Sequence, residues 1–127
     1  VKAVATSLSV PQEQWSGSQW GLYLKLLPRP VPSTLILELD RVHRLSTSPN
    51  TEVRFAFLLL ALESGYDGYN QFVDEFLSKI GRFRYVIPLL KALASLPNGR
   101  HLARSLFDRV KSGYPPITTA HGERLLR

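Results

Sequence analysis

Apolar residues recur along much of this chain at intervals of three and four positions, which is the spacing of one face of an α-helix. Two segments share the same spacing and carry Phe72, Val73, Phe76, Leu77 and Ile80 in one case, and Leu102, Ala103, Leu106, Phe107 and Val110 in the other. We expect the phenylalanines among them to lie in the core. Alternation with period two gives only a weak hint in residues 1–10. The pattern therefore predicts an all-α protein of six or seven short helices.

Serine and asparagine side chains mark the expected starts of the first three helices, because they accept hydrogen bonds from free backbone amides. The expected caps are Ser18, Ser33, and either Asn50 or Ser48. The third of these helices, through about residue 64, is apolar on nearly all sides, so we expect it to be buried between neighbours. Residues 28–32, Pro-Arg-Pro-Val-Pro, are expected to form an extended connector.

Glycine and proline set the later boundaries. We expect Gly81 just beyond the end of the helix over residues 69–80, and Pro88 in the first turn of the next helix, where a missing N–H costs little. Pro115 and Pro116 are expected to start the last helix. Antiparallel helix pairs with tight connections predict a right-handed α-α superhelix of armadillo- or HEAT-like stacked pairs, with a closed bundle as the alternative.

Length and composition indicate one compact domain. The chain has 127 residues, 44% of them hydrophobic and 20% charged, which argues against disorder. Residues 1–14 are rich in small residues and are expected to be a tail or linker, and residues 15–127 the domain. The longest apolar run, residues 55–62, is far shorter than the ~20 residues of a membrane span, so we expect none. We expect an intracellular protein, in the cytoplasm or an organelle.

The residue types present exclude several kinds of chemistry. With no cysteine, the chain cannot form disulfides, thiolate zinc sites or a cysteine nucleophile. The histidines, His43, His101 and His121, are far apart and form no H-E-x-x-H pair. No complete catalytic machinery and no metal site are expected in these residues.

Positive charge is concentrated in the last third of the chain. The net charge is +6, with −1 in residues 1–80 and +7 in residues 81–127. Such asymmetry is typical of a surface that meets an anion, such as nucleic acid, an acidic partner or a small carboxylate, or of a solvated basic face. Five of the cations are expected along the outer faces of the helices that follow residue 82: Lys91, Arg100, Arg104, Arg109 and Lys111.

The segment Gly81-Arg82-Phe83-Arg84-Tyr85 is the main candidate site. Arg82 and Arg84 are expected in the turn before a helix, close to its free N-terminal amides. Two guanidinium groups at such a place bind a carboxylate or a phosphate well. The alternative is that they cap the carboxyl end of the preceding helix, where cations are also favoured.

Four strings, at residues 50–55 (Asn-Thr-Glu-Val-Arg-Phe), 81–85, 88–89 (Pro-Leu) and 114–117 (Tyr-Pro-Pro-Ile), together resemble the C-terminal helical domain of leukotriene A4 hydrolase. That enzyme is one of the zinc aminopeptidases, which include aminopeptidase B. The stretches at residues 19–28 and 39–45 are most similar to plant and algal members. The likeness covers about residues 15–120, with order and spacing kept.

The resemblance implies a larger enzyme with an N-terminal β domain, a thermolysin-like zinc domain and this helical domain. The zinc motif and the G-x-M-E-N motif belong to the first two and do not occur here, so the chain alone is expected to be inactive and to hold no cofactor. In the family a Gly-Arg-x-Lys segment points into the active-site cleft and binds the substrate's carboxylate. Arg82 matches its arginine, and Arg84 replaces its lysine, which keeps the charge but changes the geometry.

The implied partner is the catalytic zinc domain of the same enzyme, and the implied ligand is a carboxylate. A different hypothesis is a stand-alone helical scaffold that binds other protein subunits in a larger assembly. Such a scaffold is expected either with or without RNA contact through its basic last third.

Overall fold

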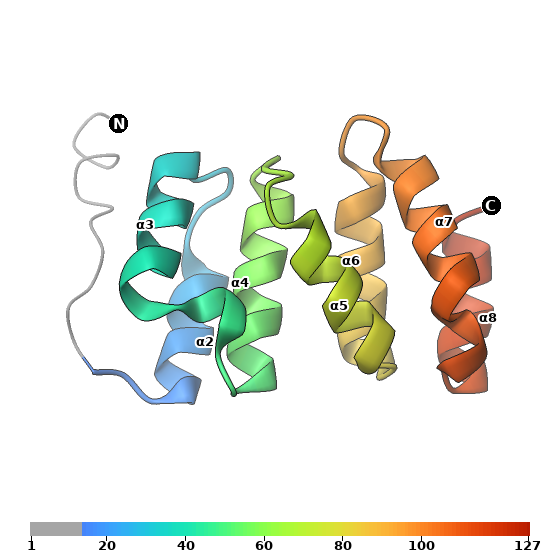
Figure 1. Ribbon diagram of the computed structural model, residues 1–127, viewed down its shortest axis with the longest axis horizontal. Coiled ribbons are helices and arrows are strands. Elements are labelled where there is room, and N and C mark those ends of the chain that lie inside the picture. The colour runs from blue at the N-terminus through green and yellow to red at the C-terminus, as the bar shows by residue number, and fades with distance from the viewer. Residues whose placement is uncertain (1–13) are drawn as a thin grey trace. The chain divides into compact units, whose positions relative to one another are not determined.

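The computed structural model describes residues 14–127, and all its regular structure is helical (Figure 1). The helices are α2 (Gly17–Leu26), α3 (Ser33–His43), the 3-10 turn η1 (Leu45–Thr47), α4 (Thr51–Glu63), α5 (Asn70–Lys79), α6 (Phe83–Ala94), α7 (Gly99–Val110), the 3-10 turn η2 (Lys111–Gly113) and α8 (Pro116–Leu125). The seven α-helices confirm the predicted all-α class. All of the expected tail except Gln14 lies outside the described residues.

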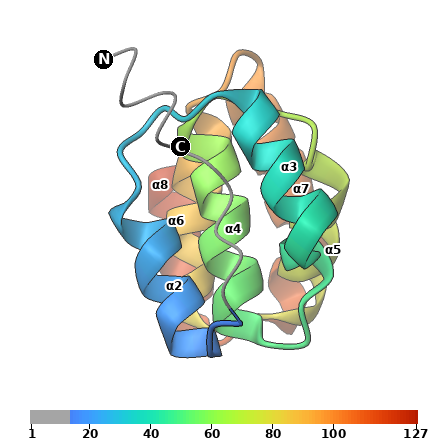
Figure 2. The ribbon, with the colours of Figure 1, turned by 90° about the vertical axis from the view of Figure 1, so that its left-hand side faces the viewer.

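The helices form two compact units, one ending at Tyr66 and the other beginning at Asp67. In the first unit α2 packs beside α4, and α3 runs in the opposite direction to both (Figure 2). In the second unit α6 packs against α7 and α8, and α5 packs against α7. Alternate helices of each unit therefore lie side by side with the same direction, as expected for stacked helix pairs.

The starts of the first helices follow capping chemistry, at positions partly different from those expected. Ser16 caps α2, with its hydroxyl accepting from the Gln19 N–H at 3.2 Å and the Gln19 side chain accepting from the Ser16 N–H at 2.8 Å. This reciprocal pair is a capping box, so the prediction of Ser18 is wrong. Ser33 is the first residue of α3 rather than its cap, because Pro32 already takes the extended cap conformation. The prediction of Asn50 is confirmed, since its Oδ1 accepts from two amides of α4.

Pro88 lies inside α6 rather than in its first turn, because α6 begins at Phe83. Proline within a helix costs about 3 kcal/mol, since it has no N–H for the carbonyl four residues earlier. Three fully buried side chains of α6, Val86, Leu89 and Leu90, each contribute about 1.5–3 kcal/mol. Burial therefore outweighs the cost of the proline, and the helix continues through it.

The core follows the apolar pattern at most positions, but Ile80 and Val110 are half-buried and Leu102 is exposed. Within α4 the buried residues are Val53, Ala56, Phe57, Leu58, Leu60, Ala61 and Leu62, which confirms a helix buried on nearly all sides. Phe76 and Phe107 are buried, whereas Phe72 is half-buried and packs its ring against Tyr69 at 5.4 Å. Among the described residues no helix is both long and apolar enough to cross a membrane.

Candidate carboxylate-binding segment

Arg82 occupies the N-cap position of α6, directly after the turn that ends α5. Its own carbonyl starts the helix by accepting the N–H groups of Tyr85 and Val86, both at 3.0 Å. Its side chain is exposed and makes no hydrogen bond or ion pair with any residue from 14 to 127. The guanidinium is therefore available to an outside ligand beside the amino end of α6.

Arg84 lies in the first turn of α6, so the prediction that both arginines precede the helix holds for Arg82 alone. The Arg84 side chain is exposed, and its guanidinium carbon lies 4.9 Å from the ring centre of Tyr85. A guanidinium above an aromatic face is stabilised by the ring quadrupole, which restricts its direction. The two cations thus differ: the Arg82 guanidinium has no partner among residues 14–127, and the Arg84 guanidinium lies against the ring of the buried Tyr85.

Neither hydrogen bonds nor charge pairs make Arg82 a cap of α5. The carbonyl groups near the end of α5 have other partners: Phe76 accepts the N–H of Ile80 at 2.8 Å, and Leu77 accepts the phenol of Tyr114 at 2.7 Å. The alternative reading of Arg82 as a C-terminal helix cap is therefore not supported by these contacts.

The turn that carries Arg82 is covered by the segment leading into α8. The Oγ1 of Thr118 donates to the carbonyl oxygen of Gly81 at 3.1 Å, and Thr118 is completely buried. Gly81 follows α5 as predicted, but its φ is not in the left-handed region. Its role is close approach, because a Cβ there would lie 3.1 Å from Tyr114 Cδ1 and 3.3 Å from Pro115 Cδ.

Tyr114 donates a hydrogen bond to the end of α5, and its phenol keeps the proton over a wide pH range. Burial and, as a smaller contribution, the charge of Asp74 together raise the pKa of its phenol to about 12. At neutral pH the phenol is therefore protonated and donates to Leu77. The end of α5 and the turn after it are thus both fixed by the segment before and within α8.

The basic last third is partly neutralised by ion pairs. Glu123 of α8 pairs with Lys111 at 2.7 Å and with Arg104 at 3.0 Å, and Asp108 also contacts both cations. The hydrogen bond from Lys111 lowers the pKa of Glu123, and the same bond raises the pKa of Lys111. Arg109 pairs with Asp74. Of the five cations expected along the outer faces, three therefore have acidic partners.

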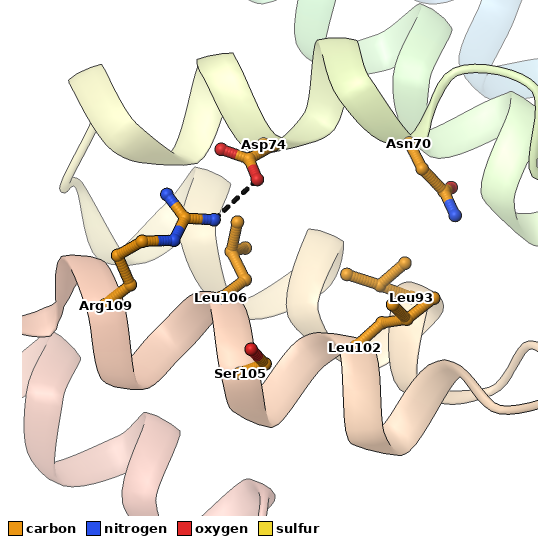
Figure 3. Close-up of a pocket in the computed structure, with 7 residues that line it drawn as sticks. All are labelled: Asn70, Asp74, Leu93, Leu102, Ser105, Leu106 and Arg109. Carbon is orange, nitrogen blue, oxygen red and sulfur yellow. Dashed lines mark hydrogen bonds and ion pairs between the residues drawn. The ribbon is translucent and has the colours of Figure 1, made fainter.

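A pocket lies between α5 and α7, and neither predicted site arginine lines it (Figure 3). It is a pocket of about 190 Å³ with a floor of leucines from α6 and α7. The Asp74–Arg109 ion pair bounds one end, and Asn70 lies toward the other. Nothing in the spacing of the sequence indicated this pocket, because it forms where side chains of three helices meet.

The described residues offer no site for the zinc that the resemblance associates with the family. Within residues 14–127 no three side chains of the His, Cys, Asp and Glu types lie close enough together to hold a metal ion. The residues therefore do not fit such a group, and no chemical step at zinc is derived for this chain.

Comparison with known proteins identifies the family to which this chain belongs. Residues 15–126 match the family described as leukotriene A4 hydrolase, C-terminal, and the chain therefore belongs to this family of helical domains. The match runs through both compact units. It confirms the resemblance that the strings at residues 50–55, 81–85 and 114–117 indicated.

Individual relatives are whole enzymes of which this chain resembles one part. Leucine aminopeptidase 2 of Aspergillus niger is 32% identical over 115 residues, which cover 88% of this chain and 18% of that protein. Leukotriene A-4 hydrolase of Xenopus laevis is 25% identical over 97 residues, covering 76% of this chain and 16% of that protein. The chain thus spans less than a fifth of these relatives.

The residues that sequence reasoning missed are those that support the site. The string at residues 114–117 contributed to the resemblance, but its spacing gave no structural role to Tyr114 or Thr118. Both act on a segment more than thirty positions away, through hydrogen bonds to the backbone at Leu77 and Gly81. Only the folded structure brings these segments together.

Proposed function

We propose that this domain presents Arg82, with Arg84 beside it, to the carboxylate of a substrate in a zinc aminopeptidase or epoxide hydrolase whose catalytic centre lies in another domain. The observation that supports this proposal is the state of Arg82. Its guanidinium is exposed and has no partner among residues 14–127, while its backbone is fixed on both sides.

The physical basis of the proposal is electrostatic complementarity at a prepared position. A guanidinium donates two parallel N–H bonds to a carboxylate, and the amino end of α6 adds a partial positive charge in the same place. Arg84 adds a second cation whose direction is restricted by Tyr85. Such a pair holds the far end of a peptide or of a fatty-acid epoxide while the zinc domain supplies the bond-breaking chemistry.

Several relatives are named leucine aminopeptidase 2, and these names favour a peptide substrate. The Xenopus laevis relative is named leukotriene A-4 hydrolase, and each of these names describes the whole protein. In this proposal the domain alone is inactive, and its contribution is to orient the substrate. Binding energy at a remote carboxylate then appears as a higher kcat/KM.

Replacing Arg82 in the full-length protein that carries this domain tests the proposal. We expect Arg82→Ala to lower kcat/KM at least tenfold, about 1.4 kcal/mol of transition-state stabilisation. Arg100→Ala is the matched control, because Arg100 is also exposed, has no partner among the described residues and lies in the first turn of a helix. An unchanged kcat/KM in Arg82→Ala would contradict the proposal.

The exposed leucines of the first unit favour a second candidate, a scaffold that binds other protein subunits. Leu22 and Leu26 lie one turn apart on α2 and are 58% and 68% exposed, and Leu37 of α3 is 47% exposed. Leu22 and Leu26, one turn apart on the same helix, form a small exposed apolar patch of the kind that a partner protein covers. The full-length coding sequence separates the two candidates: a zinc motif upstream favours the enzyme, and its absence favours the scaffold.

RNA contact through the basic last third is the weaker form of that alternative. Three of the nine Lys and Arg residues after residue 80 already pair with acidic side chains. If RNA binds, its affinity must fall steeply with salt, because counterions are released from the phosphates. No binding to a generic RNA at low salt would remove this hypothesis.

A further inference from the structure

We propose that Thr118 of α8 is a positioning residue for Arg82, because its hydroxyl fixes the peptide group from which Arg82 projects. The inference rests on the proposed function of Arg82, and it assigns a role in that function to a residue that touches no substrate. The contact that carries it is the 3.1 Å hydrogen bond from Thr118 Oγ1 to the carbonyl oxygen of Gly81.

The Gly81 carbonyl and the Arg82 N–H belong to the same planar peptide group. A hydrogen bond that holds the carbonyl oxygen therefore also fixes the direction in which the Arg82 backbone leaves the turn. On its other side, the Arg82 carbonyl is held by the amides of Tyr85 and Val86. Both peptide groups that flank Arg82 are thus fixed, and only its side-chain torsions remain to adapt to a ligand.

Loss of this hydrogen bond would leave the buried Thr118 hydroxyl without a partner. Thr118 is completely buried, and a buried hydroxyl without a partner is costly. Among the described residues its Oγ1 has no other hydrogen bond, whereas the neighbouring Thr119 bonds to carbonyl groups of Lys111 and Pro115. The Thr118 side chain therefore stabilises the turn at Gly81, whereas it makes no hydrogen bond within its own helix, α8.

The helix that carries Thr118 is itself anchored, so it can act as a fixed support. Gly122 lies so close to Phe107 of α7 that a Cβ there would be 2.4 Å from the ring. Glu123 is held by Lys111 and Arg104. These contacts fix α8 against α7 one turn beyond Thr118, and the position of Arg82 consequently depends on α8 as well as on α5 and α6.

The test uses Thr118→Val and Thr118→Ser in the full-length protein. Valine has nearly the shape of threonine but lacks the hydroxyl, and serine keeps the hydroxyl. Two readouts are needed: KM for a peptide with a free C-terminal carboxylate and for the same peptide as its C-terminal amide, and hydrogen exchange of the Tyr85 and Val86 amides, which donate to the Arg82 carbonyl.

We expect Thr118→Val to raise KM about threefold to tenfold for the free carboxylate and to leave KM for the amide unchanged, as loss of one well-placed hydrogen bond would do. In the same variant the Tyr85 and Val86 amides should exchange faster. In Thr118→Ser, which keeps the hydroxyl, KM for the free carboxylate and the exchange rates should stay close to those of the unchanged protein. If Thr118 had only a structural role, its replacement would change KM for the two peptides by the same factor.

Two results would overturn the inference: unchanged exchange of the Tyr85 and Val86 amides in Thr118→Val, or an equal rise in KM for both peptides. These outcomes are distinct from failure of the proposed function. If Arg82→Ala itself changes no kinetic constant, the proposed function fails and the substrate role of Thr118 fails with it. Faster exchange would in that case show only that Thr118 supports the turn.

Discussion

The hydroxyl of Thr118 donates to the carbonyl oxygen of Gly81, a residue 37 positions earlier, and thereby joins α8 to the turn that carries Arg82. Around this bond the two segments approach closely enough that Gly81 has no room for an unstrained side chain. The domain therefore places its candidate ligand-binding cation on a support built from its last helix.

Replacing Gly81 tests this close approach. Gly81→Ala puts a Cβ 3.1 Å from Tyr114 Cδ1, so we expect it to lower the free energy of unfolding by about 1–2 kcal/mol, as overpacking does. Gly113→Ala is the control, because a Cβ there meets nothing within 4 Å. Denaturant unfolding should show the control within about 0.5 kcal/mol of the unchanged protein. Equal effects of the two substitutions would contradict the account.

Gly122 provides a stronger test of how α8 packs against α7. Gly122→Ala brings a Cβ to 2.4 Å from the Phe107 ring, which is fully buried and cannot move away without disturbing the core. We expect a loss of about 3 kcal/mol, at the upper end for overpacking. Combining it with Phe107→Leu, which vacates ring volume, should give less than the sum of the two single effects in thermal or denaturant unfolding. If the two changes in the free energy of unfolding simply add, the Cβ introduced by Gly122→Ala does not clash with the Phe107 ring.

The raised pKa of Tyr114 predicts a loss of stability at high pH. The phenol titrates near 10 in the unfolded chain and at about 12 in the folded one, so the folded state binds more protons between these values. Its contribution is therefore complete below pH 10 and is lost as the pH rises from about 10 to 12. The free energy of unfolding of Tyr114→Phe should fall less steeply over this range than that of the unchanged protein. Parallel curves for the two proteins would rule out this role of burial.

The capping box of α2 predicts unequal effects at two nearby serines. Ser16→Ala removes the acceptor for the Gln19 amide and should cost about 1 kcal/mol. Ser18→Ala lies within the first turn of α2 and should change stability by less than about 0.5 kcal/mol. Urea denaturation of the two variants measures this difference directly. A larger effect at Ser18 would restore the original sequence-based assignment of the cap.

The sequence predicted the helices well because their boundaries are local. Proline and glycine cannot continue a helix cheaply, and the Asn50 side chain caps α4 with no help from distant residues. The cap at Ser16 was missed although Gln19, three residues on, offered the capping-box signal. Pro88 was misplaced for a different reason: burial of the α6 face decided the start of the helix, and burial is a property of the tertiary structure.

The candidate site was predictable only in its exposed part. The arginines at 82 and 84 stand out because two cations follow a glycine before an apolar helix. The support from Thr118 and Tyr114 depends on contacts across 37 positions, which no local pattern encodes. The ion pairs of Glu123 with Arg104 and Lys111 likewise form only in the folded structure. Because of them, part of the positive charge in the last third of the chain is neutralised.

The most direct test of the central claim is the dependence of Arg82 on the substrate's carboxylate. In the full-length protein, kcat/KM is measured for a peptide with a free C-terminal carboxylate and for its C-terminal amide, with and without Arg82→Ala. We predict that the unchanged protein favours the carboxylate at least tenfold, and that Arg82→Ala removes this preference while leaving the amide nearly unaffected. A preference that survives Arg82→Ala undiminished would contradict the account.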